Sequence, residues 1–287
     1  MEPPHPPPSS HDGTGDTGDT AEGRYGEAVF PPERAGEDER IDLGALAYDE
    51  TTLARLERLG AGPGWHCLEV GAGTGTVAHR LLDRTGVESV LAVDRDVRFL
   101  SARPAPGLTV MEADITGPDF DPGRFQLVHA RFVLMHLPAR RELLAGLAGL
   151  LAPGGVLVLG DAVDLTSAVA ADTPYTRTMR AMWQGLKDTI GTDVTWVPEY
   201  PRLLREAGLT SVAAEMYVPP LLPGSAISRF WADTWSRARE SMTATGLVDD
   251  ATVTEAIRCL ESPDCAELSP GLITAWGRRP GDGPSGV

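Results

Sequence analysis

The stretch LEVGAGTGT, residues 68–76, decides the fold class of this chain. It begins as an apolar strand pattern and continues through Gly71, Gly73 and Gly75 into a helix pattern at residues 76–86. A glycine-rich turn between strand and helix lets the backbone approach a ligand, and it aims free N–H groups and the positive helix end at an anionic group. The stretch therefore predicts a site for a small anionic or carboxylate-bearing cofactor.

Outward from this turn, strand and helix patterns alternate along the chain. The strand patterns lie at residues 66–73, 89–96, 108–115, within 125–137, and at 156–164, 210–218 and 271–277. Near-continuous apolar strands that alternate with helices are typical of a parallel sheet covered on both faces. We predict an α/β domain with a doubly wound, mostly parallel sheet.

Two amphipathic stretches interrupt this alternation, at about residues 173–190 and 226–260. One helical face of the first stretch carries Tyr175, Met179, Met182, Trp183, Leu186 and Ile190. A stripe of the second carries Ile227, Phe230, Trp231, Trp235 and Met242. We expect these insertions to form a helical cap, whose tryptophans either line an apolar pocket or pack against the sheet.

Composition divides the rest of the chain. Residues 1–24 are rich in Pro, Gly and Asp and lack bulky aliphatic residues after Met1, which predicts a disordered acidic tail. Residues 25–60 are predicted to be a helical arm, residues 61–280 the main domain, and residues 281–287 a flexible C-terminus.

Charge and cysteine content exclude several classes of protein. The 287 residues contain 25 Lys and Arg against 41 Asp and Glu, so we expect no nucleic-acid partner bound through a basic surface. No apolar stretch approaches the roughly 20 residues that cross a bilayer, and no basic-then-apolar signal begins the chain. We therefore expect no membrane partner and a cytoplasmic location. Three cysteines without a CxxC pattern predict neither a disulfide framework nor a metal site.

Acidic residues near the strand ends narrow the choice of cofactor. A dinucleotide fingerprint places its third glycine at position 76, where this chain has Thr76, and Glu69 precedes the first glycine by two residues. Asp94 ends the second strand pattern, where its carboxylate can accept from both ribose hydroxyls. Asp114 follows the third strand, positioned for an exocyclic amine, with Ile115 beside a flat ring. These residues predict a nucleoside that carries an amino-acid tail.

At this point the chain resembles the class I S-adenosylmethionine-dependent methyltransferases. The E-x-G-x-G-x-G pattern from Glu69 to Gly75, Asp94 after strand two and A-D-I after strand three match that family's cofactor motifs in order. Tyr48-Asp49, GPGWHCLEVGAGTG, HARFVLMHLPARR, LLAPGGVLVLG and LSPGLITAWGRRP are similar to a bacterial small-molecule branch of the family. The resemblance covers about residues 35–280 and implies a Rossmann-like, seven-stranded methyltransferase fold.

The same resemblance assigns the cofactor site for S-adenosyl-L-methionine. It implies that the glycines face the methionine portion, Glu69 holds the loop and reaches the ammonium group, Asp94 binds the ribose, and Asp114 and Ile115 lie at the adenine. The cofactor-binding residues so implied are Glu69, Gly71, Ala72, Gly73, Gly75, Asp94, Arg95, Asp114, Ile115 and Arg131.

Methyl transfer from a sulfonium is an in-line displacement, so positioning supplies most of the acceleration and no protein nucleophile is needed. A general base is required only when the acceptor loses a proton. Among His136, His129, Tyr48 and Asp161, we select His136, because it follows strand four at the ligand end of the sheet and a near-neutral pKa suits a base. A histidine at position 136 also fits a packing role. His129 falls within the strand, so we expect it to be structural.

The favoured hypothesis is a methyltransferase acting on an O, N or C atom of a small organic metabolite, with a homodimer as one assembly to test. A nicotinamide-dependent oxidoreductase is the first alternative, opposed by Thr76 and Glu69. A non-catalytic regulatory protein that binds S-adenosylmethionine is the second.

Deleting residues 1–24 should leave thermal stability and cofactor affinity nearly unchanged, because the segment has almost no apolar groups to dock on the domain. Melting curves and calorimetric titration with S-adenosylhomocysteine check this. A large fall in melting temperature on truncation would show that the tail packs on the domain.

Overall fold

The structure, a computed structural model, describes residues 25–165, 167 and 169–281. The predicted tail at residues 1–24 lies outside the described residues, as does the predicted flexible C-terminus apart from Gly281.

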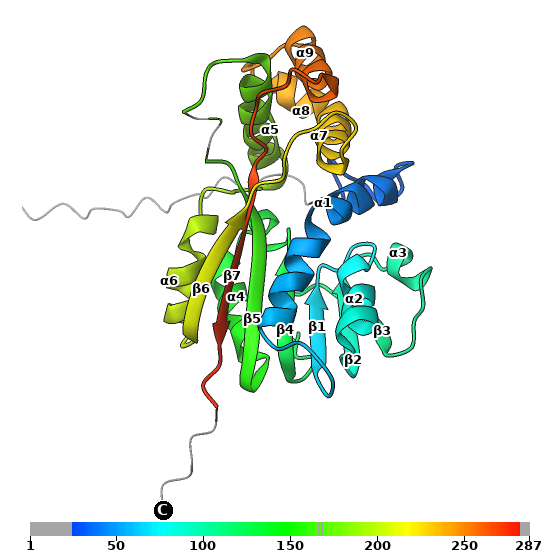
Figure 1. Ribbon diagram of the computed structural model, residues 1–287, viewed down its shortest axis with the longest axis vertical. Helices are drawn as coiled ribbons and strands as arrows, with labels where there is room; N and C mark the ends of the chain where they lie inside the picture. The colour runs from blue at the N-terminus through cyan, green and yellow to red at the C-terminus, as the bar shows by residue number, and fades with distance from the viewer. Residues whose placement is uncertain (1–24, 166, 168, 282–287) are drawn as a thin grey trace, which may run out of the picture.

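The described residues form a seven-stranded sheet in the order β3-β2-β1-β4-β5-β7-β6 (Figure 1). The strands are β1 (His66–Val70), β2 (Ser89–Asp94), β3 (Leu108–Glu112), β4 (Phe125–Arg131), β5 (Leu151–Val163), β6 (Thr210–Tyr217) and β7 (Gly271–Arg278). The neighbouring pairs among β1 to β5 are parallel, and β7 runs antiparallel to both β5 and β6. The predicted doubly wound, mostly parallel sheet is confirmed.

Helices follow the strands in the expected alternation. They are α1 (Glu37–Arg58), α2 (Thr76–Arg80) continued by η1 (Leu81–Thr85), α3 (Arg98–Ser101), η2 (Leu134–His136), α4 (Arg140–Gly149), α5 (Pro174–Ile190), η3 (Val197–Glu199), α6 (Tyr200–Glu206), α7 (Ala226–Arg237), α8 (Arg239–Ala244) and α9 (Asp250–Glu261).

The arm predicted as helical over residues 25–60 is helical only in α1. Residues 25–36, which we name the strap, consist of turns and bends. Pro31 and Pro32 lack the backbone donors that a helix interior needs, and Gly36 enters α1 at a φ of 74°. The strap is therefore a separate segment that leads into one long helix.

The two faces of the sheet bury alternate residues of the same strands, as the pleat requires. On β5, Val156 and Val158 belong to a core with α1, α2 and η1. Leu157 and Leu159 belong to a core with α4 and α6 on the other face. Helices thus cover both faces, which explains why the strand patterns are almost continuously apolar.

The cap consists of α5, α7, α8 and α9, which gather at one end of the molecule (Figure 1). Met179, Trp235, Met242 and Leu260 belong to its own buried cluster, which also takes in Tyr48 of α1. The arrow of β1 points toward the cap, so the cap lies over the carboxyl ends of the parallel strands. This edge is where open α/β sheets bind ligands.

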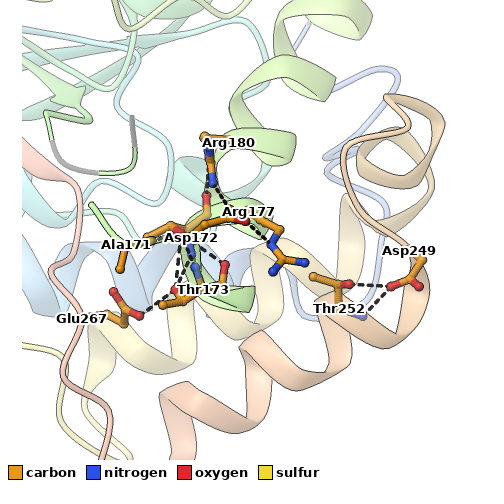
Figure 2. A network of polar contacts seen from close by, with 9 residues as sticks. Ala171, Asp172, Thr173, Arg177, Arg180, Asp249, Thr252 and Glu267 are labelled. Carbon is orange, nitrogen blue, oxygen red and sulfur yellow. Dashed lines mark hydrogen bonds and ion pairs between the residues drawn. The ribbon is translucent and has the colours of Figure 1, made fainter. Parts of the chain in front are cut away.

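Polar contacts fix the first turn of α5 and join it to the segment before β7 (Figure 2). Thr173 caps α5, and its hydroxyl donates to Glu267 at 2.7 Å in the segment that leads into β7. Asp172 forms ion pairs with Arg177 and Arg180 at 3.2 and 2.6 Å. The capping hydrogen bonds define where α5 starts. The bond to Glu267 holds this end of the helix to the segment before β7.

Within the described ranges, no helix is long and apolar enough to cross a membrane. In that same part of the chain, no group of three or more His, Cys, Asp or Glu side chains is arranged to hold a metal ion. The three cysteines are free thiols, with Cys67 buried in the sheet and the sulfurs of Cys259 and Cys265 lying 2.8 Å apart.

Candidate functional site

A cavity of about 510 Å³ lies between the carboxyl ends of the parallel strands, α1, the strap and the cap. Its walls include the glycine turn after β1, residues 94–96 at the end of β2, residues 113–115 after β3, and residues 131–133 and 135–137 at the end of β4. Side chains of α5 and α7 close the remaining side. The volume falls within the range of about 300–1,000 Å³ typical of small-molecule sites.

The glycine turn adopts the backbone that its sequence predicts. Gly71, Gly73 and Gly75 have φ values of 64°, 57° and 81°, which residues with a Cβ rarely adopt. The expectation of free N–H groups is wrong for most of the turn. Gly71 and Ala72 donate to the carbonyl of Val93, Gly73 donates to Asp94, and Gly75 donates to Ala72. The turn presents its backbone surface to the cavity rather than these donors.

At Gly71 and Gly75, neighbouring side chains of the protein leave no room for a Cβ. A Cβ on Gly71 would lie 2.3 Å from Val133 Cγ2 in the loop after β4, and one on Gly75 would lie 2.7 Å from Leu100. Gly71 and Gly73 line the cavity, whereas Gly75 is outside its lining and starts α2. A Cβ at Gly73 would meet only Ile41, at 3.5 Å, so its exposed face fits a closely approaching ligand.

Asp94 joins the end of β2 to the glycine turn. Its Oδ2 accepts from Gly73 N at 2.8 Å and its Oδ1 accepts from Asp96 N at 3.2 Å. Burial raises the pKa of Asp94 above its ordinary value, against the lowering effect of these hydrogen bonds. The neighbouring Arg95 lines the cavity and pairs with Glu27 of the strap at 2.5 Å.

Asp114 and Ile115, which the resemblance assigns to the adenine, lie in the cavity wall after β3. Asp114 Oδ1 accepts from the backbone N–H and the hydroxyl of Thr116, at 2.9 and 2.6 Å. Ile115 is partly buried against the core that contains α4. The bonds to Thr116 orient the carboxylate, and the side chain of Ile115 offers an apolar contact next to it.

Glu69 and Arg131 line the cavity while making contacts within the protein. Glu69 is 3% exposed, and its Oε2 lies at hydrogen-bond distance, 2.7 Å, from His129 Nδ1. His129 is buried within β4 and therefore supports Glu69, in line with a structural role. The guanidinium of Arg131 reaches α1, where it donates to Asp49 at 2.6 Å.

The loop after β4 is held in a strained conformation beside the glycine turn. Phe132 has a φ of 57°, a region that residues with a side chain seldom occupy. The buried carboxylate of Asp161 accepts from Val133 N at 3.0 Å, from Met135 N at 3.3 Å and from the hydroxyl of Tyr200. Asp161, a candidate base on sequence grounds, lies outside the cavity lining and positions this loop.

His136 is at the end of the same loop and lines the cavity. Its Nδ1 lies 2.8 Å from the hydroxyl of Thr192, and its ring centroid is 4.4 Å from that of Tyr25. Burial, with the positive charges of Arg40 and Arg140, lowers the pKa of His136 to about 3. The expectation of a near-neutral pKa is therefore wrong, and the imidazole is uncharged at neutral pH.

The strap closes one side of the cavity, a feature that sequence analysis missed. Tyr25, Phe30 and Pro32 line the cavity directly. Glu27 and Glu33 form ion pairs with Arg95 and Arg98, at 2.5 and 2.6 Å. The sequence did contain a hint of the strap, because Tyr25 and Phe30 are the first Phe, Trp or Tyr residues of the chain. No local pattern predicts which surface such residues cover.

The three tryptophans of the cap and Trp196, which follows α5, differ in their surroundings. Trp183 and Trp231 line the cavity, with ring centroids 6.1 Å apart in an edge-to-face arrangement. Trp196 and Trp235 are buried and lie outside the cavity lining. Tyr48 also lines the cavity, and burial raises its pKa above the usual range, so its hydroxyl stays protonated. The prediction of a pocket lining is therefore correct for Trp183 and Trp231, whereas Trp196 packs in the core that contains the sheet and Trp235 packs in the cap's own cluster.

Residues 68–157, which run from the glycine turn into β5, match the family model described as a methyltransferase domain. This segment, about a third of the chain, is similar to methyltransferase domains. It contains the glycine turn, Asp94, Asp114, Arg131 and His136.

Among curated proteins, the methyltransferase str3 of Strobilurus tenacellus is 40% identical over 96 residues, which is 33% of this chain and 34% of that protein. Phosphoethanolamine N-methyltransferase 1 of Arabidopsis thaliana is 26% identical over 172 residues, 58% of this chain and 33% of that protein. The chain thus spans about a third of the length of the curated relatives it matches. These relatives are fungal and plant proteins, so the bacterial branch stays a prediction.

Solved structures share the fold of most of this chain. YcgJ of Bacillus subtilis aligns with a TM-score of 0.56 at 15% identity, over 81% of this chain and 99% of that one. Phosphoethanolamine N-methyltransferase 2 of Haemonchus contortus, in complex with S-adenosyl-L-methionine, aligns with a TM-score of 0.55 at 15% identity, over 86% and 59%. The expected Rossmann-like methyltransferase fold is confirmed.

Asp161 should make stability depend on pH. Burial raises its pKa from 3.8 to about 7 in the folded state, while Tyr200, the backbone donors and Arg140 act in the opposite direction. Because the folded pKa exceeds the unfolded one, this group stabilises the fold below about pH 4, and that contribution is lost as the pH rises through about 7. Relative to Asp161→Asn, the parent's free energy of unfolding should fall by up to about 1.4 kcal/mol per pH unit in this window.

Chemical denaturation at pH 5, 6 and 7.5 measures this difference. Asp83→Asn, at an exposed position, is the matched control and should differ from the parent by the same amount at each pH. A difference between parent and Asp161→Asn that does not change with pH would contradict the assignment.

Proposed function

We propose that this protein transfers a methyl group from S-adenosyl-L-methionine to an O, N or C atom of a small organic metabolite. The observation that carries the proposal is one continuous cavity. Its lining includes the glycine turn and strand-end acids on one side and the aromatic residues of the strap, α1 and the cap on the other. A site of this kind accommodates a nucleoside and a second molecule together.

The residues at the carboxyl edge fit the cofactor. Gly71 and Gly73 offer backbone surface without a Cβ, and the half-buried Asp94 offers carboxylate oxygens for a ribose. Asp114 and Ile115 offer a polar and an apolar contact for a base. When bound, the cofactor supplies a methyl group already activated on a sulfonium. Positioning is then the main task of the protein.

The chain's own residues position the acceptor and exclude water. Tyr48 and Phe132 meet edge to face, with ring centroids 5.3 Å apart, next to the cap tryptophans. We keep His136 as the proposed proton-accepting residue for acceptors that lose a proton, because Thr192 anchors its Nδ1 at 2.8 Å and the ring lines the cavity. Its low pKa makes it a weak base, so methyl transfer would depend on orientation more than on proton transfer.

The relatives' names support methyl transfer as the activity but leave the acceptor open. The plant relative is named for N-methylation of phosphoethanolamine. The strongly acidic composition supports a small molecule over a nucleic acid as partner. The homodimer and the cytoplasmic location stay predictions.

Asp94→Ala should weaken binding of S-adenosylhomocysteine about tenfold or more, since hydrogen bonds to a charged group contribute roughly 1.5–3 kcal/mol. Calorimetric titration measures the change. Glu112→Ala is the matched control, because Glu112 is exposed at the end of β3 and pairs in register with Asp94. Asp94→Asn keeps one oxygen for Gly73 N–H and should recover part of the affinity. Unchanged affinity in Asp94→Ala would remove the ribose assignment.

Trp183→Ala should reduce methylation by about tenfold or more while S-adenosylhomocysteine affinity stays within about twofold, because the ring is an aromatic contact on the acceptor side. Mass spectrometry of methylated products from a metabolite library measures turnover. Trp65→Ala is the control, since Trp65 is also half-buried but lies outside the cavity lining. A folded Trp183→Ala with the parent's turnover of every acceptor would exclude this part of the cap from recognition. Cofactor binding without any turnover by the parent would favour the regulatory alternative.

A further inference from the structure

Aromatic side chains form the cavity wall on the side of the strap, α1 and the cap. They are Tyr25, Phe30, Tyr48, Phe132, Trp183, Phe230 and Trp231. Several meet edge to face: Trp183 and Trp231 at an interplanar angle of 78°, and Phe230 and Trp231 at 68° with centroids 5.0 Å apart. Such walls offer both ring faces and ring edges, which favour a flat aromatic ligand over a flexible aliphatic one.

One arginine is buried within this aromatic wall. Arg40 of α1 is 3% exposed, and its guanidinium carbon lies 4.2 Å from the ring centroid of Phe30 and 5.5 Å from that of Phe230. Nε donates to Glu37 at 3.1 Å, and Nη2 donates to Glu37 and to Tyr25. The Nη1 atom has only a 3.5 Å contact with the hydroxyl of Thr234, at the limit of hydrogen-bond distance.

Tyr25 offers a second donor beside Arg40. Its hydroxyl oxygen accepts from Arg40 Nη2 at 2.9 Å. Among the described residues, no hydrogen bond uses the hydroxyl's own hydrogen. Both residues line the cavity, so an oxygen-bearing ligand group there can accept from the phenol and from Arg40 Nη1 together.

The charge around Arg40 is only partly compensated. Glu37 also lies 3.4 Å from Arg237 Nη1, so one buried carboxylate serves two guanidinium groups. The other partner of Arg237 is Asp233, whose side chain is 36% exposed and therefore screened by water. Glu69 is already bonded to His129. Glu27 and Glu33 of the strap also line the cavity, but each is paired with an arginine after β2. Within the aromatic wall, Arg40 therefore favours an anionic group over a cationic one.

The geometry points to a planar aromatic acceptor that carries an anionic oxygen group, bound at that group by Arg40 and Tyr25. This inference rests on the proposed methyl-transfer function, because it names the class of acceptor for the same cavity. Arg40 is the residue that determines specificity for the anionic group, and the aromatic walls bind the ring.

Calorimetric titration of the S-adenosylhomocysteine-saturated protein tests the inference with three probes of one shape: 2-naphthoate, neutral 2-naphthamide and 2-naphthylmethylammonium. We expect naphthoate to bind about tenfold or more tightly than naphthamide, since its group accepts charge-assisted hydrogen bonds, and the ammonium probe to bind most weakly. In Arg40→Gln the preference for naphthoate should fall below about threefold. Glu37 keeps Arg237 as an ion-pair partner in this variant.

Arg58→Gln is the matched control, because Arg58 is on the same helix but outside the cavity lining, and it should keep the parent's preference. Tyr25→Phe retains the ring and removes one donor, so it should reduce the preference about threefold. If Arg40→Gln fails to fold, the preference for naphthoate measured in Tyr25→Phe tests the inference in its place. The affinity for S-adenosylhomocysteine is measured for every variant.

Equal affinity of the parent for naphthoate and naphthamide, or tighter binding of the ammonium probe, overturns the inference. An unchanged preference in folded Arg40→Gln, or in Tyr25→Phe when Arg40→Gln does not fold, also overturns it. If the parent binds S-adenosylhomocysteine but shows no preference among the probes, only the acceptor class is wrong. If it does not bind S-adenosylhomocysteine, the proposed function itself fails.

Discussion

The close approach of the glycine turn to the loop after β4 is the constraint on which the site depends. Gly71 leaves room for Val133, whose Cγ2 would lie 2.3 Å from a Cβ at that position. Asp161 holds the same loop through the N–H groups of Val133 and Met135. Because the loop carries Phe132 and His136 into the cavity, its fixed conformation sets the distance between the cofactor side and the acceptor side.

Three charged side chains of the cavity wall have partners within the protein. Glu69, Arg131 and Arg40 belong to different elements of the cavity wall, and each is paired within the protein: Glu69 with His129, Arg131 with Asp49, and Arg40 with Glu37. Pairing is expected, since an isolated buried charge is expensive. The acidic net charge of the chain therefore says little about the cavity, whose aromatic side carries a guanidinium that is only partly compensated.

The strap connects the cofactor side to the acceptor side. Glu27 and Glu33 bind Arg95 and Arg98 after β2, while Tyr25 contacts His136 and Arg40. The ion pairs on the rim are exposed and contribute little individually, whereas Phe30 is buried in the cap cluster. The strap is therefore held mainly by its aromatic contacts, and it supplies part of the wall that an acceptor would touch.

The sequence by itself determined the parallel sheet, the glycine turn, the position of Asp94 and Asp114 at strand ends, and the amphipathic cap helices. These features are local: periodicity decides which residues are buried, and positive φ selects glycine. Tertiary structure alone decided that Gly73 N–H binds Asp94, that Asp161 holds a loop instead of facing the cavity, and that burial beside Arg40 and Arg140 lowers the pKa of His136. It also decided which tryptophans line the cavity and where the strap lies. Such properties depend on burial and on partners distant in sequence, which no local pattern specifies.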